Sequence, residues 1–220
     1  KAHIDRIHAM QEMKDIQEEK RVMLDSVASR MGNKTIELSG ICKSYGEKKL
    51  IEDFSYIFLK KDRIGIIGHN GCGKSTLLKI INGIIKPDVG TIEIGQTIKI
   101  GYFSQENEYM DESERVIDYV KEGEKRRLYL LRVLMEAPNV LILDEPTNDL
   151  DIQTLTILED YLDHFDGIIL IVSHDRYFLD RTVSRIFAFN GGGKIRQSEG
   201  GYSDYLIRVE LEKPKDGQTI

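Results

Sequence analysis

The chain contains no tryptophan, only four prolines and only two cysteines among its 220 residues. Two thiols, Cys42 and Cys72, cannot form a disulfide framework, so they indicate reduced cysteines and a cytoplasmic protein. The longest apolar run, Gly167 to Val172, is far shorter than the roughly 20 residues of a membrane span. The first thirty residues lack the apolar core of a signal peptide. A formal net charge of −6 gives little support to a general affinity for nucleic acid, but does not exclude a local basic face.

Residues 1–30 contain neither glycine nor proline, and apolar side chains recur in them at helical spacing amid dense mixed charge. This pattern predicts a long, narrowly amphipathic helix over residues 1–32 that ends at Gly32. Such a helix could cover its own domain. We prefer the alternative that it is the end of a linker from another domain, because its apolar stripe is narrow and no helix-start signal precedes it.

From about residue 33 the pattern changes to short apolar strands that alternate with helices. Buried strands with helices between them indicate an α/β fold with a parallel core sheet. The strand-rich beginning of this region suggests an added antiparallel layer at one edge. Expected strands are 35–42, 50–59, 64–68, 91–94, 98–103, 140–143, 168–173, 185–190 and 194–197, and expected helices are 74–82, 125–135 and 152–165. We expect one domain over 33–208 and a flexible tail over 209–220.

The segment from Gly68 to Ser75 reads GHNGCGKS and lies between a predicted strand and a predicted helix. It matches the phosphate-loop pattern G-x-x-x-x-G-K-[ST] of P-loop NTPases, in which glycines let backbone N–H groups surround a polyphosphate. Lys74 would supply a positive charge to the β- and γ-phosphates, and the Ser75 hydroxyl would contact Mg²⁺. The alternative, a glycine-rich turn with a chance lysine, does not explain the flanking strand and helix. The expected nucleotide contacts are Gly68, His69, Asn70, Gly71, Cys72, Gly73, Lys74, Ser75 and Thr76.

Two adjacent carboxylates, Asp144 and Glu145, follow the apolar run in LILDEPTNDLD. Neighbouring residues of a strand point to opposite faces, so the two acids can take different roles at its end. Asp144 is placed to hold Mg²⁺, which prefers hard oxygen ligands. Glu145 would then orient and deprotonate a water for in-line attack on the γ-phosphate. Two surface acids are the alternative, but a buried strand beside a phosphate loop argues against it.

Two further polar residues follow predicted strands. His174 comes directly after the buried strand 168–173, and Gln105 follows the strand 98–103. Open α/β sheets bind ligands at the carboxyl ends of their strands. His174 would contact the γ-phosphate and hold Glu145 and the water in position, and Gln105 is a candidate contact to Mg²⁺. A strand-end glutamine alone would be an ordinary loop residue.

Together these residues resemble the ABC ATPase family over residues 35–205. Gly68–Ser75 resembles its Walker A motif, LILDE its Walker B motif with catalytic Glu145, Asn148–Asp151 its D-loop, Ser173–Asp175 its H-loop, and Gln105 its Q-loop. Tyr45, in KSYG, matches the aromatic residue that stacks on adenine. The resemblance implies ATP as the substrate and Mg²⁺ as the cofactor.

The family's signature motif, LSGGQ, is altered in this chain. Residues 120–124 read VKEGE ahead of the helix EKRRLYLLRVL, and only Gly123 and Glu124 match it plausibly. The family also inserts a helical subdomain of several tens of residues between the Q-loop and the signature. Either this protein lacks that subdomain, or a segment is missing from the sequence near 120–124. The second alternative is preferred, because the helix after the signature is intact.

Three features resemble the ABC-F subfamily in particular. They are the motif EPTNDLD, the charged N-terminal helix, which resembles an interdomain linker, and the segment GGYSDYLIRVE. The resemblance implies a second ATPase domain and the ribosome as partners, without a membrane-spanning segment. In this family ATP lies between the phosphate loop of one domain and the signature of the other, so Gly123 and Asp151 are expected to face the partner domain.

Two other functions are consistent with the same motifs. One is the nucleotide-binding subunit of an ABC transporter, for which a long N-terminal linker would be unexpected. The other is a nucleotide-dependent module that binds DNA or RNA with negligible turnover. The presence of both Glu145 and His174 argues against the latter.

Overall fold

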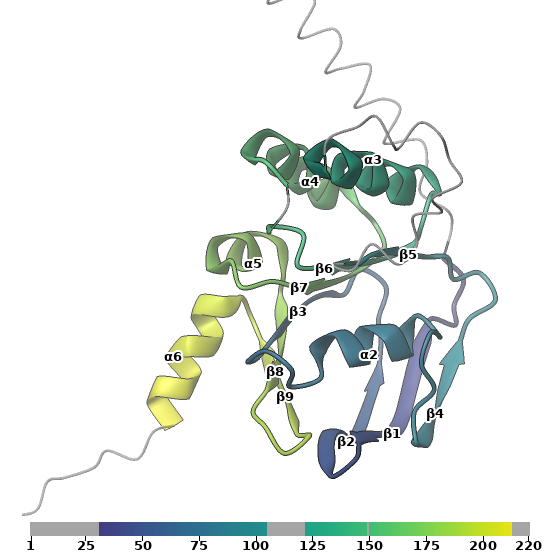
Figure 1. Cartoon of the computed structure of the whole chain (residues 1–220), viewed down its shortest axis with the longest axis vertical. Coiled ribbons are helices and arrows are strands. Elements are labelled where there is room, and N and C mark those ends of the chain that lie inside the picture. The colour runs from purple at the N-terminus through teal and green to yellow at the C-terminus, as the bar shows by residue number, and fades with distance from the viewer. Residues whose placement is uncertain (1–30, 105–121, 149, 213–220) are drawn as a thin grey trace, which may run out of the picture.

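The structure is a computed structural model that describes residues 31–104, 122–148 and 150–212. Two sheets and several helices form these parts of the chain (Figure 1). The strands are β1 (Ile36–Tyr45), β2 (Lys48–Ile57), β3 (Arg63–Ile67), β4 (Val89–Ile94), β5 (Ile100–Phe103), β6 (Val140–Asp144), β7 (Ile168–Val172), β8 (Arg185–Phe189) and β9 (Ile195–Glu199). The helices are α2 (Lys74–Ile81), α3 (Glu122–Met135), α4 (Ile152–His164), α5 (Arg176–Thr182) and α6 (Tyr202–Glu212).

A six-stranded sheet forms the centre, in the order β5-β6-β7-β3-β8-β9. Its first five strands run parallel, and β9 pairs with β8 in the antiparallel direction. Every residue of β6 and β7 is buried, because helices cover both faces of the sheet. Side chains of β7 alternate between two apolar clusters: Ile168 and Leu170 pack with α2, whereas Ile169 and Ile171 pack with α3, α4 and α5.

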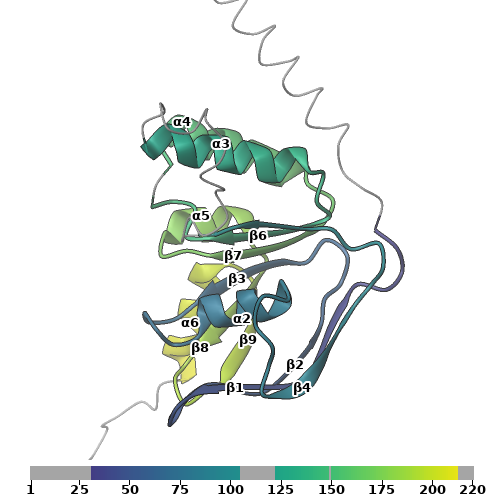
Figure 2. The ribbon, with the colours of Figure 1, turned by 45° about the vertical axis from the view of Figure 1, so that its right-hand side comes forward.

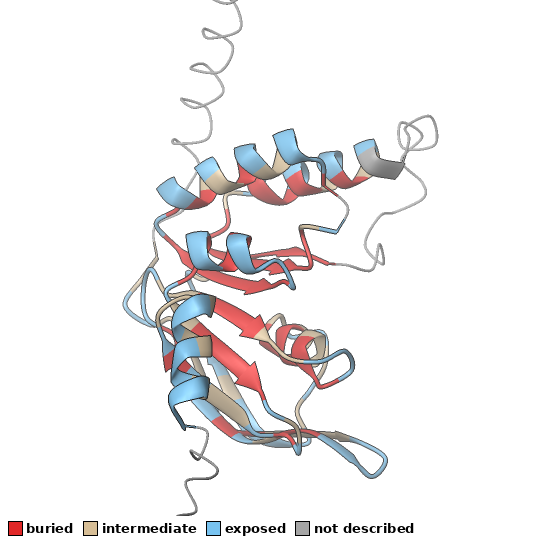
Figure 3. Cartoon of the chain, turned by 90° about the vertical axis from the view of Figure 1, so that its left-hand side faces the viewer, coloured by how far each residue is buried: buried red, intermediate tan, exposed pale blue. Residues whose placement is uncertain are grey.

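Helix α2 lies between the central sheet and a second, three-stranded antiparallel sheet in the order β2-β1-β4 (Figure 2). Leu77 and Ile80 of α2 are buried in the same cluster as Leu38 and Phe58 near the second sheet. On the opposite side, α3 and α4 turn their buried residues toward the sheet and their exposed residues outward (Figure 3). The predicted α/β fold with a parallel core and an added antiparallel layer is therefore confirmed.

Strand boundaries agree with the predicted ones to within a few residues, but two helices were not predicted. Helix α5 begins two residues after His174, and α6 continues to Glu212, beyond the domain boundary predicted at residue 208. The predicted linker helix lies outside the described residues except for its last two. Met31 packs against the core, and the Gly32 N–H donates to the Thr97 hydroxyl at 2.8 Å, so the chain is not helical there.

Candidate nucleotide-binding and catalytic site

The predicted phosphate loop connects β3 to α2 at the carboxyl edge of the central sheet. Gly73 precedes the helix with a φ of 117°, and a Cβ atom there would lie 3.0 Å from the Leu50 carbonyl oxygen. At Gly68, where φ is 152°, a Cβ atom would lie 2.8 Å from Cys72 Sγ. Both positions therefore require glycine, because no other residue combines this backbone with this space. The loop places the first turn of α2, with its unpaired N–H groups, beside the pocket.

Lys74 is buried although it carries an ammonium group. Its Nζ donates hydrogen bonds to the carbonyl oxygens of Gly68, at 2.9 Å, and His69, at 3.2 Å. These bonds hold the positive charge within the curve of the loop. A charge in this position attracts the phosphates of a nucleotide, in addition to the attraction of the helix N-terminus.

A pocket of about 290 Å³ opens between the phosphate loop and the ends of β6 and β7. Most of the predicted loop residues line it, together with both predicted acids and the predicted histidine. The lining residues are Asn70, Gly71, Gly73, Lys74, Ser75, Thr76, Asp144, Glu145, Asn148, Val172 and His174. Segments more than 100 residues apart in the sequence thus meet in one concave site, as expected at the carboxyl edge of a parallel sheet.

Asp144 ends β6, and its carboxylate is buried beside the pocket. Burial raises its pKa, and hydrogen bonding with Ser75 and Tyr102 and the charge of Lys74 act in the opposite direction. Its Oδ1 atom is buried and has no hydrogen-bond partner among the residues that the structure describes. A carboxylate oxygen in this situation, next to a serine hydroxyl, fits Mg²⁺, which binds through one or two carboxylates together with phosphates and water.

Glu145, the next residue, has a backbone φ of 52°, which is unusual for a residue with a side chain. This conformation costs on the order of 1–2 kcal/mol and directs the carboxylate into the pocket instead of along the strand. The Glu145 N–H donates to the Val172 carbonyl oxygen at 2.9 Å, which fixes the turn against β7. Burial raises the pKa of Glu145, whereas the neighbouring His174 and Lys74 lower it.

His174 connects the phosphate loop with Glu145. Its Nε2 lies 3.3 Å from Glu145 Oε1 and 3.2 Å from Asn70 Oδ1. The ring therefore lies between Glu145 and the loop, within reach of both. The other carboxylate oxygen, Glu145 Oε2, is buried and has no hydrogen-bond partner within the described parts of the chain, so its capacity as an acceptor is unused.

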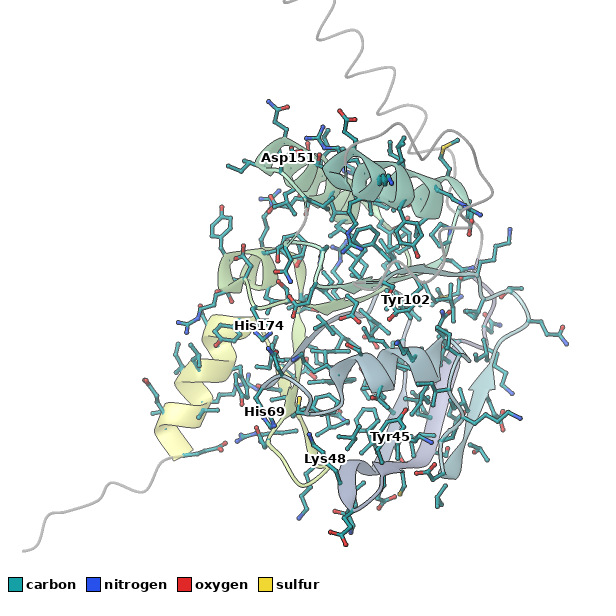
Figure 4. All side chains as sticks on the ribbon, in the orientation of Figure 1. Tyr45, Lys48, His69, Tyr102, Asp151 and His174 are labelled. Atoms are coloured by element: carbon teal, nitrogen blue, oxygen red, sulfur yellow. The ribbon has the colours of Figure 1, made fainter. Side chains whose placement is uncertain are left out.

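Four predicted contacts, Gly68, His69, Cys72 and Tyr45, do not line this pocket. Tyr45 ends β1 with its ring exposed, and Lys43 Nζ lies 5.5 Å from the ring centroid. In the view of Figure 4, His69 lies between His174 and Lys48, with Tyr45 beyond Lys48 on the same side of the molecule. His69 does not line the pocket, and Cys72 is buried behind the loop.

The remaining predicted residues concern the metal and the partner domain. Gln105 lies outside the described residues, and Gly123 lies within the first turn of α3 instead of ahead of it. Asp151 caps α4: its carboxylate accepts the Thr154 N–H at 2.9 Å and forms an ion pair with Arg127 of α3. Tyr102 and Asn148 were not predicted as site residues, although Tyr102 is near Gln105 in sequence and Asn148 lies in the turn after the acid pair.

Solved structures with the same fold include ATP-binding proteins. One, described as the ATP-binding subunit of an ABC transporter, aligns with a TM-score of 0.64 over 82% of this chain and 95% of its own, at 18% identity. A dimeric ATP-binding cassette in a post-hydrolysis state, bound to ADP and phosphate, aligns with a TM-score of 0.59 over 75% of this chain and 98% of its own, at 20% identity. These similarities show the fold. Among the described residues, no helix is both long and apolar enough to cross a membrane.

Curated relatives are more similar in sequence. The uncharacterised ABC transporter ATP-binding protein YfmR of Bacillus subtilis is 41% identical over 97% of this chain and 40% of its own length. The ATP-binding protein Uup of Escherichia coli is 36% identical over 90% of this chain and 38% of its own. The energy-dependent translational throttle protein EttA of Escherichia coli is 38% identical over 80% of this chain and 38% of its own. The chain thus spans about two fifths of the length of these relatives.

The profile of the ABC transporter family matches residues 51–122 and 102–148, which include the phosphate loop and the acid pair. The alignment with YfmR extends over 251 positions, although the chain has 220 residues, so YfmR has residues at positions where this chain has none. The predicted motifs, the fold and the relatives agree. The chain therefore belongs to the ABC ATPase family and is an ATP-binding domain whose curated relatives are ABC-F proteins.

Proposed function

We propose that this domain hydrolyses ATP in a Mg²⁺-dependent reaction and couples closure against a second ATPase domain to binding of the ribosome. The hydrolytic part rests on one observation: the bridge from Asn70 through His174 to Glu145 at the mouth of a pocket that also contains Lys74 and Asp144. A nucleotide-binding module without turnover would not need a buried acid held in this way.

Each residue of the pocket has its own role in the proposed hydrolysis. The backbone N–H groups of the phosphate loop and the Lys74 ammonium hold the β- and γ-phosphates. Asp144 and Ser75 would hold Mg²⁺, which supplies charge neutralisation for the phosphates. Glu145 orients a water and takes its proton as the water oxygen attacks the γ-phosphorus, and the bond to the bridging oxygen of ADP breaks. His174 keeps Glu145 in line and contacts the γ-phosphate.

The role on the ribosome rests on sequence similarity. The relative EttA is described as a translational throttle protein and is 38% identical to this chain. The resemblance of the EPTNDLD and GGYSDYLIRVE segments to ABC-F proteins points in the same direction. A transporter subunit remains the second candidate, because solved structures of this fold include ABC transporter subunits.

The proposed hydrolysis of ATP is tested with two variants, in which ATP binding and ATP hydrolysis are measured separately. Lys74→Ala should weaken ATP binding at least tenfold, since it removes the charge within the loop. Glu145→Gln should bind ATP like the wild type and lose at least 100-fold in hydrolysis, a typical contribution of general-base catalysis. Binding is measured by titration with a fluorescent ATP analogue and hydrolysis by phosphate release. Unchanged hydrolysis in Glu145→Gln would refute the assignment of the general base.

The partner is tested by co-sedimentation with ribosomes in the presence of ATP, using the full-length protein. Glu145→Gln should be enriched in the ribosome pellet relative to the wild type, because it binds ATP without consuming it. The double variant Lys74→Ala, Glu145→Gln is the control, and it should lose the enrichment. Equal amounts of all three proteins in the pellet would favour the alternative hypothesis of an ABC transporter subunit.

A further inference from the structure

A tyrosine of the neighbouring strand contacts the proposed metal ligand. Tyr102 lies in β5, directly opposite Ile142 of β6, two residues before Asp144. Its hydroxyl donates a hydrogen bond to Asp144 Oδ2 at 3.4 Å, and both side chains are buried. The hydroxyl thus contacts one carboxylate oxygen, whereas the other, Oδ1, has no hydrogen-bond partner in the described part of the chain.

Helix α3 fixes the end of β5 that carries this tyrosine. The Tyr129 hydroxyl donates to the Tyr102 carbonyl oxygen at 2.9 Å. Arg126 donates to the Ser104 carbonyl oxygen at 2.9 Å, and its guanidinium lies 4.9 Å from the centroid of the Phe103 ring. Together with the ladder to β6, these contacts hold the backbone of Tyr102 from two sides. The fold therefore holds the backbone that carries this hydroxyl beside Asp144.

We infer that Tyr102 is a positioning residue for Asp144, which it orients so that Oδ1 is the oxygen offered to Mg²⁺. A carboxylate without such a partner can rotate and present either oxygen. The charge of the donor matters too. The neutral phenol of Tyr102 donates to Oδ2 without neutralising the carboxylate, whereas a lysine or arginine at this place would compete with Mg²⁺ for the negative charge of Asp144. Hydrogen-bond partners of metal ligands act in this way in many metal sites. The inference rests on the proposed Mg²⁺·ATP site.

The test uses Tyr102→Phe, which removes the hydroxyl and keeps the ring. Binding of a fluorescent ATP analogue is measured twice, once in EDTA and once over a titration with Mg²⁺. We expect the Mg²⁺ concentration at half-maximal stimulation to rise about tenfold, the lower end of the effect of losing such a partner. Affinity in EDTA should stay unchanged, because the phosphate loop is not altered. Mn²⁺ affinity of the nucleotide complex, measured by electron paramagnetic resonance, should fall by the same factor.

The matched control is Tyr161→Phe, which removes the hydroxyl of a half-buried tyrosine of α4 that packs against Phe165, just after the helix. It should leave both titrations unchanged. A Tyr102→Phe protein with the Mg²⁺ dependence of the wild type would overturn the inference. So would an equal loss of affinity with and without Mg²⁺, since that result indicates a structural role only. Absence of any Mg²⁺ stimulation in the wild type would instead refute the proposed site itself.

Discussion

At the scale of the residue, the site places two acids where burial opposes their ionisation. Asp144 is the clearer case, because burial is the largest influence on its pKa and raises it. A carboxyl group with a raised pKa in the folded state binds its proton more tightly there than in the unfolded chain. Stability therefore falls as the pH rises through the window above about 3.9, the ordinary value for aspartate. At neutral pH the ionised carboxylate of Asp144 lowers the stability of the folded chain. Functional sites commonly contain groups that reduce stability in this way.

This argument predicts that Asp144→Asn unfolds at a higher temperature than the wild type at pH 7 without nucleotide or Mg²⁺. The difference should shrink in acid, where Asp144 takes up its proton. Asp88→Asn is the control with the opposite sign, because hydrogen bonds from Lys43 and the Ser44 N–H lower the pKa of exposed Asp88. Thermal unfolding by circular dichroism at pH 7 and pH 5 measures both. A lower melting temperature for Asp144→Asn at pH 7 would contradict the prediction.

Some residue positions could be predicted from the sequence and others could not. Asp144, Glu145 and His174 follow buried parallel strands, so their meeting at one edge of the sheet follows from the strand pattern. The Tyr102 contact depends on the register between β5 and β6, which the strand pattern alone does not specify. Likewise, the ion pair between Arg127 and Asp151 depends on how α3 and α4 lie side by side.

At the scale of the element, α6 differs from the strands that the sequence predicted well. Strands such as β7 consist of apolar residues that are buried on both sides, which is a clear signal in a sequence. Helix α6 has no fully buried residue. Its partly buried Tyr202 and Tyr205 pack against the core, and polar contacts add to this packing, including the Ser203 N–H to Asp180 of α5 at 2.8 Å and an ion pair between Arg196 of β9 and Glu212. Contacts to side chains distant in sequence leave no local pattern, so this helix was missed.

These contacts predict that Asp180→Ala destabilises the docking of α6. Asp180 accepts an N–H of the first helical turn, which has no partner within the helix, and removing such a group costs about 0.5–2 kcal/mol. Limited proteolysis should then cleave within α6 faster than in the wild type, with little change in ATP affinity. Glu210→Ala, at an exposed position of the same helix, is the control and should digest at the wild-type rate. An equal rate for both variants would show that Asp180 does not hold the helix.

At the scale of the whole molecule, the domain contains the half of an ATP site that its own strands and loop can build. The phosphate loop, both acids and His174 all lie at one edge of the central sheet. The other half, in the family that the sequence resembles, is the signature of a second domain. Residues 120–124 of this chain match that signature poorly, and the alignment with YfmR includes positions that this chain lacks. We therefore expect ATP binding and domain pairing to be separable in this protein.

The expected separation can be tested by inserting a helical subdomain that ends in the family's LSGGQ signature between Ser104 and Glu124, in the Glu145→Gln background. Chains with and without the insertion should bind ATP with similar affinity, because the described residues build the pocket. Only the chain with the insertion should form an ATP-dependent dimer, measured by light scattering coupled to gel filtration, since it alone offers a complete signature to its partner. An inserted segment with its signature serine changed to arginine is the control and should remain monomeric. ATP-dependent dimerisation of the unmodified Glu145→Gln chain would contradict this view, because it would mean that residues 105–123 already provide the opposing half.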